Sequence, residues 1–344
     1  MRNISITILT ISFFLTAGAQ TSWKKIQEEL IVANPPFKEC HASTIIEVAP
    51  GILIASFFAG TGEGEKDVTI WQATSKNDQW SLPAVVADGI QSDQERFPCW
   101  NPVLFKTTEG KLFLFYKVGP KPYSWWGMYK ISTDEGKSWG AAEKFPEGLL
   151  GPIKNKPVQL TDGSILSPSS KEENNAWKVF VEKSMDKGNT WQLIPVNTAN
   201  AIKVIQPTIL QYPHGKIQLL CRSNQDKIMQ AWSNNNGDSW GKFSATTLPN
   251  PNAGIDAVTL KSGWQMLVYN PTTKGKGWAD GREKLNVAVS KDGIRWKEVV
   301  VLENGTREEF SYPAIIETSD GRVHITYTWD RKNIKHVVLE ENKK

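Results

Sequence analysis

Short apolar runs, each placed after a glycine, recur along the chain at the spacing of a repeated unit. In each run β-branched and aromatic residues are continuous or alternate with polar ones, a pattern typical of β-strands. The glycine provides the positive φ that a tight turn needs. The six runs follow Gly51, Gly110, Gly163, Gly215, Gly263 and Gly321. With another strand before each glycine, the pattern predicts six hairpins and no long helix.

A second repeat adds two more strands to each unit. Its pattern is S-x-D-x-G-x-x-W, and its final tryptophans lie 49 to 59 residues apart, a period typical of propellers and solenoids. The copies run from Ser132 to Trp139, from Ser184 to Trp191, from Ser233 to Trp240 with Asn235 in the Asp position, and, one residue shorter, from Ser290 to Trp296, with a degenerate copy that ends at Trp80. We expect the Ser and Asp to hold a turn between the third and fourth strands, and the Trp to pack between units.

Six units of four strands predict an all-β fold, a six-bladed β-propeller with antiparallel four-stranded blades. The sequence has 344 residues, a length that would ordinarily suggest two domains. A repeat architecture grows by adding units, and no Pro/Ser-rich linker interrupts the chain. Residues 20–344 are therefore predicted to form one propeller, which we expect to be the catalytic domain.

The N-terminus has the pattern of a secretory signal peptide over residues 1–19. Arg2 provides the charge, Ile4 to Leu15 form the apolar segment, and Ala17-Gly18-Ala19 form the cleavage site. The alternative is a short membrane anchor, although the apolar segment is shorter than the ~20 residues that span a bilayer. We therefore expect an exported protein, periplasmic or extracellular, without a membrane span.

Charge and composition narrow the function. The net charge of +4 is mild, and no basic stripe interleaved with aromatic residues indicates nucleic-acid binding. Three cysteines allow at most one disulfide, and the four histidines have no metal-site spacing. We predict no cofactor, no metal and no nucleic-acid partner, and we expect a monomer.

The residues that begin the inner strands are polar in every predicted unit. Inner strands line the axis of a propeller, so these residues should face one mouth of the channel. A strand-end polar residue can simply cap the backbone or meet water, but six in register predict a pocket for a small polar ligand. They are His41 to Ser43, Asn101, Lys156, Gln206, Asp256 and Tyr312.

Three residues at this mouth match a known pattern. Arg222 lies in Leu220-Cys221-Arg222-Ser223, Arg282 begins Arg282-Glu283-Lys284-Leu285-Asn286, and Tyr312 follows Arg282 by thirty residues. With the repeats, this spacing resembles the sialidase superfamily of six-bladed Asp-box propellers over nearly all of the mature chain. The resemblance implies that a Tyr, activated by a Glu, is the nucleophile and that three Arg hold the substrate carboxylate. A Tyr nucleophile is an exception to the two-carboxylate rule of glycosidases.

The chain departs from that pattern at two positions and leaves two others open. His41 lies where the resemblance places the first Arg, ten residues before Gly51, and Gln206 lies where it places the Glu, sixteen residues before Arg222. Glu63 or Glu65 can replace the usual loop acid, or can be solvated loop carboxylates. Arg96 can replace the missing guanidinium or form a surface salt bridge.

Because Gln cannot take the proton of a Tyr hydroxyl, the residues favour another reaction on an acidic sugar. Our first hypothesis is β-elimination from a uronate-containing oligosaccharide by a lyase or dehydratase, with His41 and Tyr312 as acid–base pair, Glu63 as a further catalytic candidate, and Arg222 and Arg282 on the carboxylate. Substrate contacts are also expected from Arg96, Asn101, Lys156, Gln206 and Asp256. The alternatives are a sialidase-type exo-glycosidase, with Glu63, Glu65 or Asp256 as acid/base, and a non-catalytic carbohydrate-binding propeller.

Overall fold

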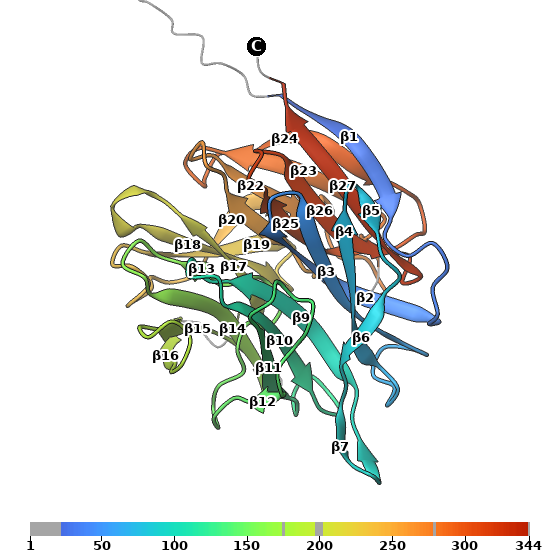
Figure 1. The fold of residues 1–344 in the computed structure, drawn as a ribbon. Helices are drawn as coiled ribbons and strands as arrows, with labels where there is room; N and C mark the ends of the chain where they lie inside the picture. Colours follow the sequence, from blue (N-terminus) through green and yellow to red (C-terminus); the bar gives the residue numbers. More distant parts are fainter. Residues whose placement is uncertain (1–21, 174–175, 197–201, 278–279, 343–344) are drawn as a thin grey trace, which may run out of the picture.

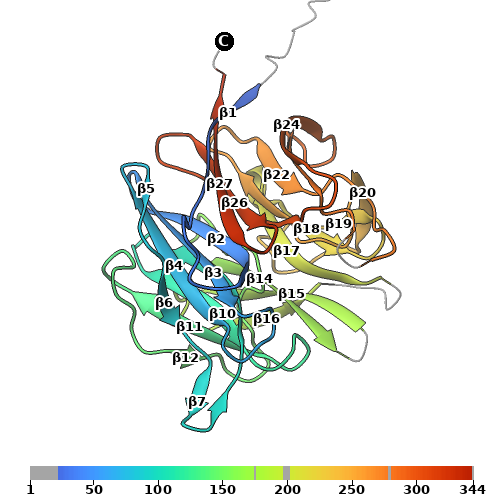
Figure 2. The same ribbon diagram turned by 90° about the vertical axis from the view of Figure 1, so that its right-hand side faces the viewer.

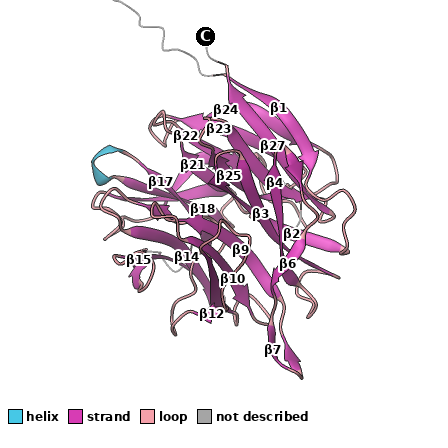
Figure 3. Ribbon diagram, in the orientation of Figure 1, coloured by secondary structure: helices cyan, strands magenta, loops and turns pink. Residues whose placement is uncertain are grey.

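The computed structural model describes residues 22–173, 176–196, 202–277 and 280–342. Strands make up nearly all of the regular structure in these residues, and the exception is a 3₁₀ turn at Pro213–Gly215 (Figure 3). The strands form six blades arranged around a common centre (Figures 1 and 2). The predicted fold class, an all-β six-bladed propeller with antiparallel four-stranded blades, is confirmed.

The first three blades follow the chain from the inner strand outward. Blade 1 contains β2 (Glu39–Ala49), β3 (Ile52–Gly60), β4 (Thr69–Lys76) and β5 (Gln79–Trp80), and β6 (Ala84–Ala87) also pairs with β4. A separate hairpin, β7 (Ile90–Ser92) and β8 (Glu95–Arg96), leads to blade 2. Blade 2 contains β9 (Cys99–Lys106), β10 (Leu112–Val118), β11 (Trp126–Ser132) and β12 (Glu143–Lys144). Blade 3 contains β13 (Val158–Gln159), β14 (Ile165–Glu173), β15 (Ala176–Ser184) and β16 (Gln192–Pro195).

The last three blades complete the ring. Blade 4 contains β17 (Val204–Gln211), β18 (Ile217–Ser223), β19 (Lys227–Ser233) and β20 (Ser244–Pro249). Blade 5 contains β21 (Asp256–Thr259), β22 (Gln265–Tyr269), β23 (Lys284–Ser290) and β24 (Lys297–Asn304). Blade 6 contains β25 (Phe310–Glu317), β26 (Val323–Trp329) and β27 (Asn333–Glu341), with β1 (Trp23–Leu30) as its outer strand.

Strand β1 closes the ring, because it pairs with β27 from the opposite end of the chain (Figure 1). The ladder joins Trp23 to Glu341 and Leu30 to Lys335. All three cysteines are buried and free, so strand pairing and burial hold the ring closed without a disulfide. Removing β1 would expose the edge of blade 6.

The S-x-D-x-G-x-x-W repeats form the predicted turns. In the first, Ser132 Oγ accepts the N–H of Gly136, and the carboxylate of Asp134 accepts the N–H and hydroxyl of Ser138. Trp139 Nε1 then donates to Gln72 in blade 1 at 2.9 Å. The box therefore satisfies its own backbone, and its Trp joins neighbouring blades.

The inner strands of four blades share a β-bulge near the mouth of the channel. The residues at the bulges have positive φ, a conformation that non-glycine residues rarely adopt. They are Ala42 (φ 56°), Asn101 (37°), Gln206 (54°) and Tyr312 (52°). Such strain persists where the surrounding structure fixes it, and it concentrates at functional sites. The bulges thus lie at the mouth of the channel where the sequence places the polar residues that begin the inner strands.

Two histidines stack in the blade that closes the ring. Nδ1 of His324 lies 3.0 Å from Nε2 of His336, and Nδ1 of His336 lies 3.0 Å from Oε1 of Glu29 on β1. Burial, and after it the charge of His336, lower the pKa of His324 to about 4. His324 is therefore neutral in the folded protein over the range where a free imidazole gains its proton.

We expect acid to destabilise the fold through His324 by about 1–3 kcal/mol as the pH falls from about 6.5 to about 4. In the unfolded chain His324 takes up a proton near pH 6.5, whereas in the folded chain it does so only near pH 4. Urea unfolding at several pH values measures the decline. His324→Gln cannot be protonated at this position, so its stability should fall less. Equal declines in the two proteins would contradict the prediction.

Candidate active site

Tyr312, on inner strand β25, has its phenol oxygen held by two donors from blade 4. Nη1 of Arg222 donates to this oxygen at 2.7 Å, and Nε2 of Gln206 donates at 3.2 Å. Nη1 of Arg222 also lies 3.3 Å from Oε1 of Gln206, an interaction that orients the amide. An oxygen that receives two N–H donors is well suited to carry negative charge.

The guanidinium of Arg222 is positioned by two residues besides Tyr312. Its Nε donates to Oδ1 of Asn252 at 2.8 Å, and its Cζ lies 6.0 Å from the centre of the Trp177 ring. Nε and Nη1 are thus used within the protein. Among the described residues, no side chain accepts a hydrogen bond from Nη2, which leaves this group for a ligand.

His41 lies against Tyr312, with 4.2 Å between the ring centroids. Its side chain is only 2% exposed, and burial, followed by the charge of Arg331, lowers the pKa of His41 well below its ordinary value. The imidazole is therefore neutral near neutral pH. Its Nδ1 lies 2.9 Å from Oγ1 of Thr328, which itself accepts the N–H of Ala42 at 3.2 Å.

Glu309 joins two arginines beside this pair. Its carboxylate lies 2.9 Å from Nη1 of Arg282 and 2.8 Å from Nε of Arg331. Burial acts to raise the pKa of Glu309, but the guanidinium groups of Arg331 and Arg282 outweigh it and hold the pKa below its ordinary value. Arg331 also reaches Glu63 at 2.6 Å. Ion pairs that the sequence did not predict therefore connect Arg282 to Glu63, beside the neutral His41.

Lys156 and Asp256, both predicted as substrate contacts, bind each other. Nζ of Lys156 lies 2.8 Å from Oδ2 of Asp256. Asp256 is 2% exposed and also accepts the hydroxyl of Thr208 at 2.8 Å and the N–H of Ile315 at 3.0 Å. This pair links the inner strands of blades 3, 4, 5 and 6 across the centre of the ring.

Lys154 strengthens the same crossing. It is 4% exposed, and its Nζ donates to Oδ1 of Asn155 at 2.8 Å, to the carbonyl of Ile255 at 3.0 Å and to the carbonyl of Pro313. Burial lowers the pKa of Lys154 to about 7, against the opposing charge of Asp256. The centre of the propeller is thus filled by polar side chains from blade 3 that bind the other blades.

The other predicted residues lie near the mouth without joining the Tyr312 cluster through a described side-chain hydrogen bond. Asn101 is buried at its bulge. Arg96 donates to the carbonyl of Asp67 at 3.3 Å, which connects it to the acid loop. Glu65, the alternative to Glu63, is exposed.

Sequence reasoning missed three residues of the cluster: Glu309, Arg331 and Asn252. Arg331 follows the end of β26, the second strand of blade 6, and Arg222 lies near the end of the second strand of blade 4. A search of second-strand ends would therefore have found Arg331. Glu309 and Asn252 lie in loops between blades, and no repeat marks them.

Comparison with known proteins places the chain in a family. The family model of the BNR repeat-like domain matches residues 51–325. The chain belongs to this family. No curated protein matches the sequence.

Among solved structures, a protein of unknown function from Dyadobacter fermentans has 18% identity to this BNR repeat-like protein and a TM-score of 0.76, with 93% of this chain and 100% of that chain covered. Trypanosoma rangeli sialidase has 16% identity and a TM-score of 0.70, with 87% and 54% covered, so the match spans about half of that chain. A mutant of NanB sialidase from Streptococcus pneumoniae has 11% identity and a TM-score of 0.70, with 91% and 70% covered. These similarities confirm the resemblance to the sialidase superfamily at the level of the fold.

Residues 1–19, the predicted signal peptide, lie outside the described residues. Within the described ranges, no helix is long and apolar enough to cross a membrane. The same ranges contain no group of three or more His, Cys, Asp or Glu that could hold a metal ion.

Proposed function

We propose that this BNR repeat-like protein is a carbohydrate-active enzyme that acts on an acidic saccharide by β-elimination from a uronate. The observation that carries the proposal is the contact between His41 and Tyr312, whose rings lie 4.2 Å apart beside two arginines. Elimination needs a base for the C5 proton, an acid for the group that leaves C4, and positive charge near the carboxylate.

Tyr312 suits the role of base. Its oxygen receives the N–H groups of Arg222 and Gln206, so a phenolate is stabilised by two hydrogen bonds, one of them from a cation. Gln206 replaces a basic Glu but still contributes as a donor. The phenolate would accept the proton from C5, and the electron pair of that bond would form the double bond between C4 and C5.

His41 suits the role of hydrogen-bond donor to the leaving oxygen. The hydroxyl oxygen of Thr328 accepts the N–H of Ala42. Among the described residues, the acceptor within reach of the Thr328 hydroxyl proton is Nδ1 of His41. Thr328 then donates to Nδ1, and the imidazole carries its own proton on Nε2. That N–H would donate a hydrogen bond to the oxygen that leaves C4. The proton that the Tyr312 oxygen took from C5 would then pass to the leaving oxygen, which restores the phenolate. If this oxygen belongs to another sugar the enzyme is a lyase, and if it is a free hydroxyl the enzyme is a dehydratase.

The charges beside the pair favour an anionic substrate. Arg222, Arg282 and Arg331 provide positive charge near the neutral His41, against the carboxylates of Glu309 and Glu63. Nη2 of Arg222 is available to the substrate carboxylate, and the resulting interaction strengthens as negative charge develops at C5 and on the carboxylate.

A second candidate is retaining hydrolysis with Tyr312 as nucleophile. It is favoured by the two donors on the Tyr312 oxygen and by the similarity to solved sialidases. Gln206 argues against it, because an amide cannot take the phenol proton. Glu63 would have to leave its ion pair with Arg331 to act as the acid.

A screen of acidic oligosaccharides tests the proposal when two products are followed together. Elimination creates a conjugated double bond that absorbs in the ultraviolet, whereas hydrolysis creates a new reducing end without this absorbance. We expect ultraviolet-absorbing product from the native protein, and a loss of about 10²-fold or more in kcat for His41→Ala. Reducing ends without absorbance would favour the second candidate. Unchanged elimination by His41→Ala would overturn the assigned pair.

A further inference from the structure

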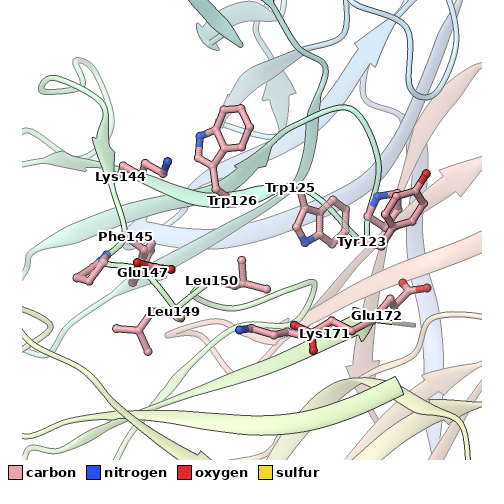
Figure 4. A pocket seen from close by; sticks show the side chains of 14 residues that line it. Tyr123, Trp125, Trp126, Lys144, Phe145, Glu147, Leu149, Leu150, Lys171 and Glu172 are labelled. Atoms are coloured by element: carbon pink, nitrogen blue, oxygen red, sulfur yellow. The ribbon is translucent and has the colours of Figure 1, made fainter. Parts of the chain in front are cut away.

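A groove lies between blades 2 and 3, next to the candidate active site. Its volume is about 570 Å³, within the range of ~300–1,000 Å³ typical of small-molecule sites. We call it the blade 2–3 groove. Its walls are Pro122, Tyr123, Trp125 and Trp126 on one side and Lys171, Glu172 and Glu173 on the other, with residues 144–150 between them. Figure 4 shows Tyr123 and Trp125 opposite Lys171 and Glu172, with Leu149 and Leu150 between.

Buried charges hold the floor of this groove in place. The carboxylate of Glu182 accepts the N–H of Leu150 at 2.9 Å and of Gly151 at 2.8 Å. Nζ of Lys117 donates to the carbonyl of Pro152 at 2.7 Å. Both charged side chains are almost completely buried, at 1% and 0% exposure. The floor is therefore preorganised, which lowers the ordering cost of binding.

The aromatic wall is anchored at its base and open to solvent at its tip. Trp100 donates to the carbonyl of Gly119 at 2.8 Å and lies 5.8 Å from Trp125 with an edge-to-face geometry. Tyr123 is 69% exposed. Rigid aromatic rings of this kind offer a large apolar face at low entropic cost, and the C–H face of a sugar can pack on such a face.

Packed side chains connect the walls of the groove to the Tyr312 site along two paths. Trp125, Trp100, Phe58, His41 and Tyr312 form an unbroken row of ring contacts, with centroids 4.2 to 6.2 Å apart. On the opposite wall, Glu172 is hydrogen-bonded to Trp177 and feels the charge of Arg222. The groove and the Tyr312 site are therefore neighbours.

The charges of the two sites differ. The Tyr312 site has an excess of arginine, whereas the groove is lined by Glu147, Glu172 and Glu173 against Lys144 and Lys171. Nζ of Lys144 is also engaged over the Trp126 ring at 5.0 Å. The groove thus disfavours a second anion, and its carboxylates and Lys171 can bind hydroxyl and amide groups.

We propose that the blade 2–3 groove is a subsite for a neutral sugar residue, joined to the acidic residue that Tyr312 and His41 act on. This inference rests on the proposed function for the identity of the acidic residue. The substrate is then an oligosaccharide of at least two residues in which an acidic sugar is next to a neutral one. Trp125 and Tyr123 pack on the neutral residue, and the wall from Lys171 to Glu173 contacts its polar groups.

The test uses the full chain and defined di- and tetrasaccharides, one series with uronate alternating with neutral N-acetylhexosamine and one of uronate alone. Turnover gives KM, and titration calorimetry gives Kd even without turnover. We expect Tyr123→Ala and Trp125→Ala to weaken tetrasaccharide binding about 10-fold in the alternating series, with at most ~2-fold change in kcat. Trp125→Phe should restore most of the binding. Met185→Ala, a 68% exposed apolar side chain in the blade 3 Asp-box turn, is the matched control.

The outcomes separate this inference from the proposed function. Binding that depends on both rings, without ultraviolet-absorbing product, keeps the subsite and removes the elimination. Elimination that is indifferent to both substitutions keeps the reaction and overturns the subsite. Equal or stronger binding of the uronate series also overturns it, and so does an absence of binding in both series. Tyr123→Ala keeps the test valid if Trp125→Ala fails to fold, because Tyr123 is largely exposed.

Discussion

We expect Tyr312→Phe to lower kcat on the acidic saccharide by about 10²–10⁴-fold, the range for loss of a general base. The substitution removes only the phenol oxygen, which accepts hydrogen bonds from Arg222 and Gln206. The ring, its contact with His41 and the backbone of β25 are retained. KM should change little, because Arg222 gains rather than loses freedom to bind the substrate carboxylate. Initial rates across a range of substrate concentrations measure both constants.

Tyr129→Phe is the matched control for this substitution. The hydroxyl of Tyr129 binds Glu143 at 2.6 Å on the outer strands of blade 2, away from the Tyr312 cluster. We expect its kcat to equal that of the native protein. A Tyr312→Phe protein that retains full turnover would exclude Tyr312 as base and as nucleophile, and would end both candidate reactions.

Most of the fold can be predicted from the sequence because its signals are local. Each glycine marks a turn inside one hairpin, and each Ser-Asp box satisfies its own backbone, as Ser132 and Asp134 do. Counting these signals therefore counts the blades. Strand β1 is the exception, because its partner β27 lies at the other end of the chain. The pattern from Trp23 to Val32 is suitable for a strand, but nothing local tells which blade it completes.

The site is predictable only in part, because it depends on distances between blades. Spacing along the chain gave Arg222, Arg282 and Tyr312, and the structure connects the first and third directly. Spacing could not reveal that Glu309 joins Arg282 to Arg331, since these residues come from different loops. The repeat pattern alone makes the first residues of all six inner strands look equivalent. In the structure Lys156 and Asp256 form an ion pair, whereas the oxygen of Tyr312 accepts hydrogen bonds.

The pairing of Lys156 with Asp256 gives the second large prediction. We expect Asp256→Ala to lower the free energy of unfolding by about 3 kcal/mol, the lower end of the cost of breaking a buried ion pair, because Lys156 is 19% exposed while Asp256 is buried. The substitution also removes the acceptor for the hydroxyl of Thr208 and for the N–H of Ile315. Three neighbouring blades lose their contact at the centre of the ring, so the loss should appear in urea unfolding of the whole domain.

A surface ion pair of similar length provides the control. Glu340 lies 3.0 Å from Lys24, and their side chains are 41% and 52% exposed. Because water screens such a pair, Glu340→Gln should change stability by no more than about 0.5 kcal/mol. If Asp256 acted instead as a substrate ligand, Asp256→Ala would keep the stability of the native protein and raise KM. Loss of stability at Asp256 and not at Glu340 would show that the centre of the ring serves the fold. The reaction would then take place at the mouth, where Tyr312 meets His41 and Arg222.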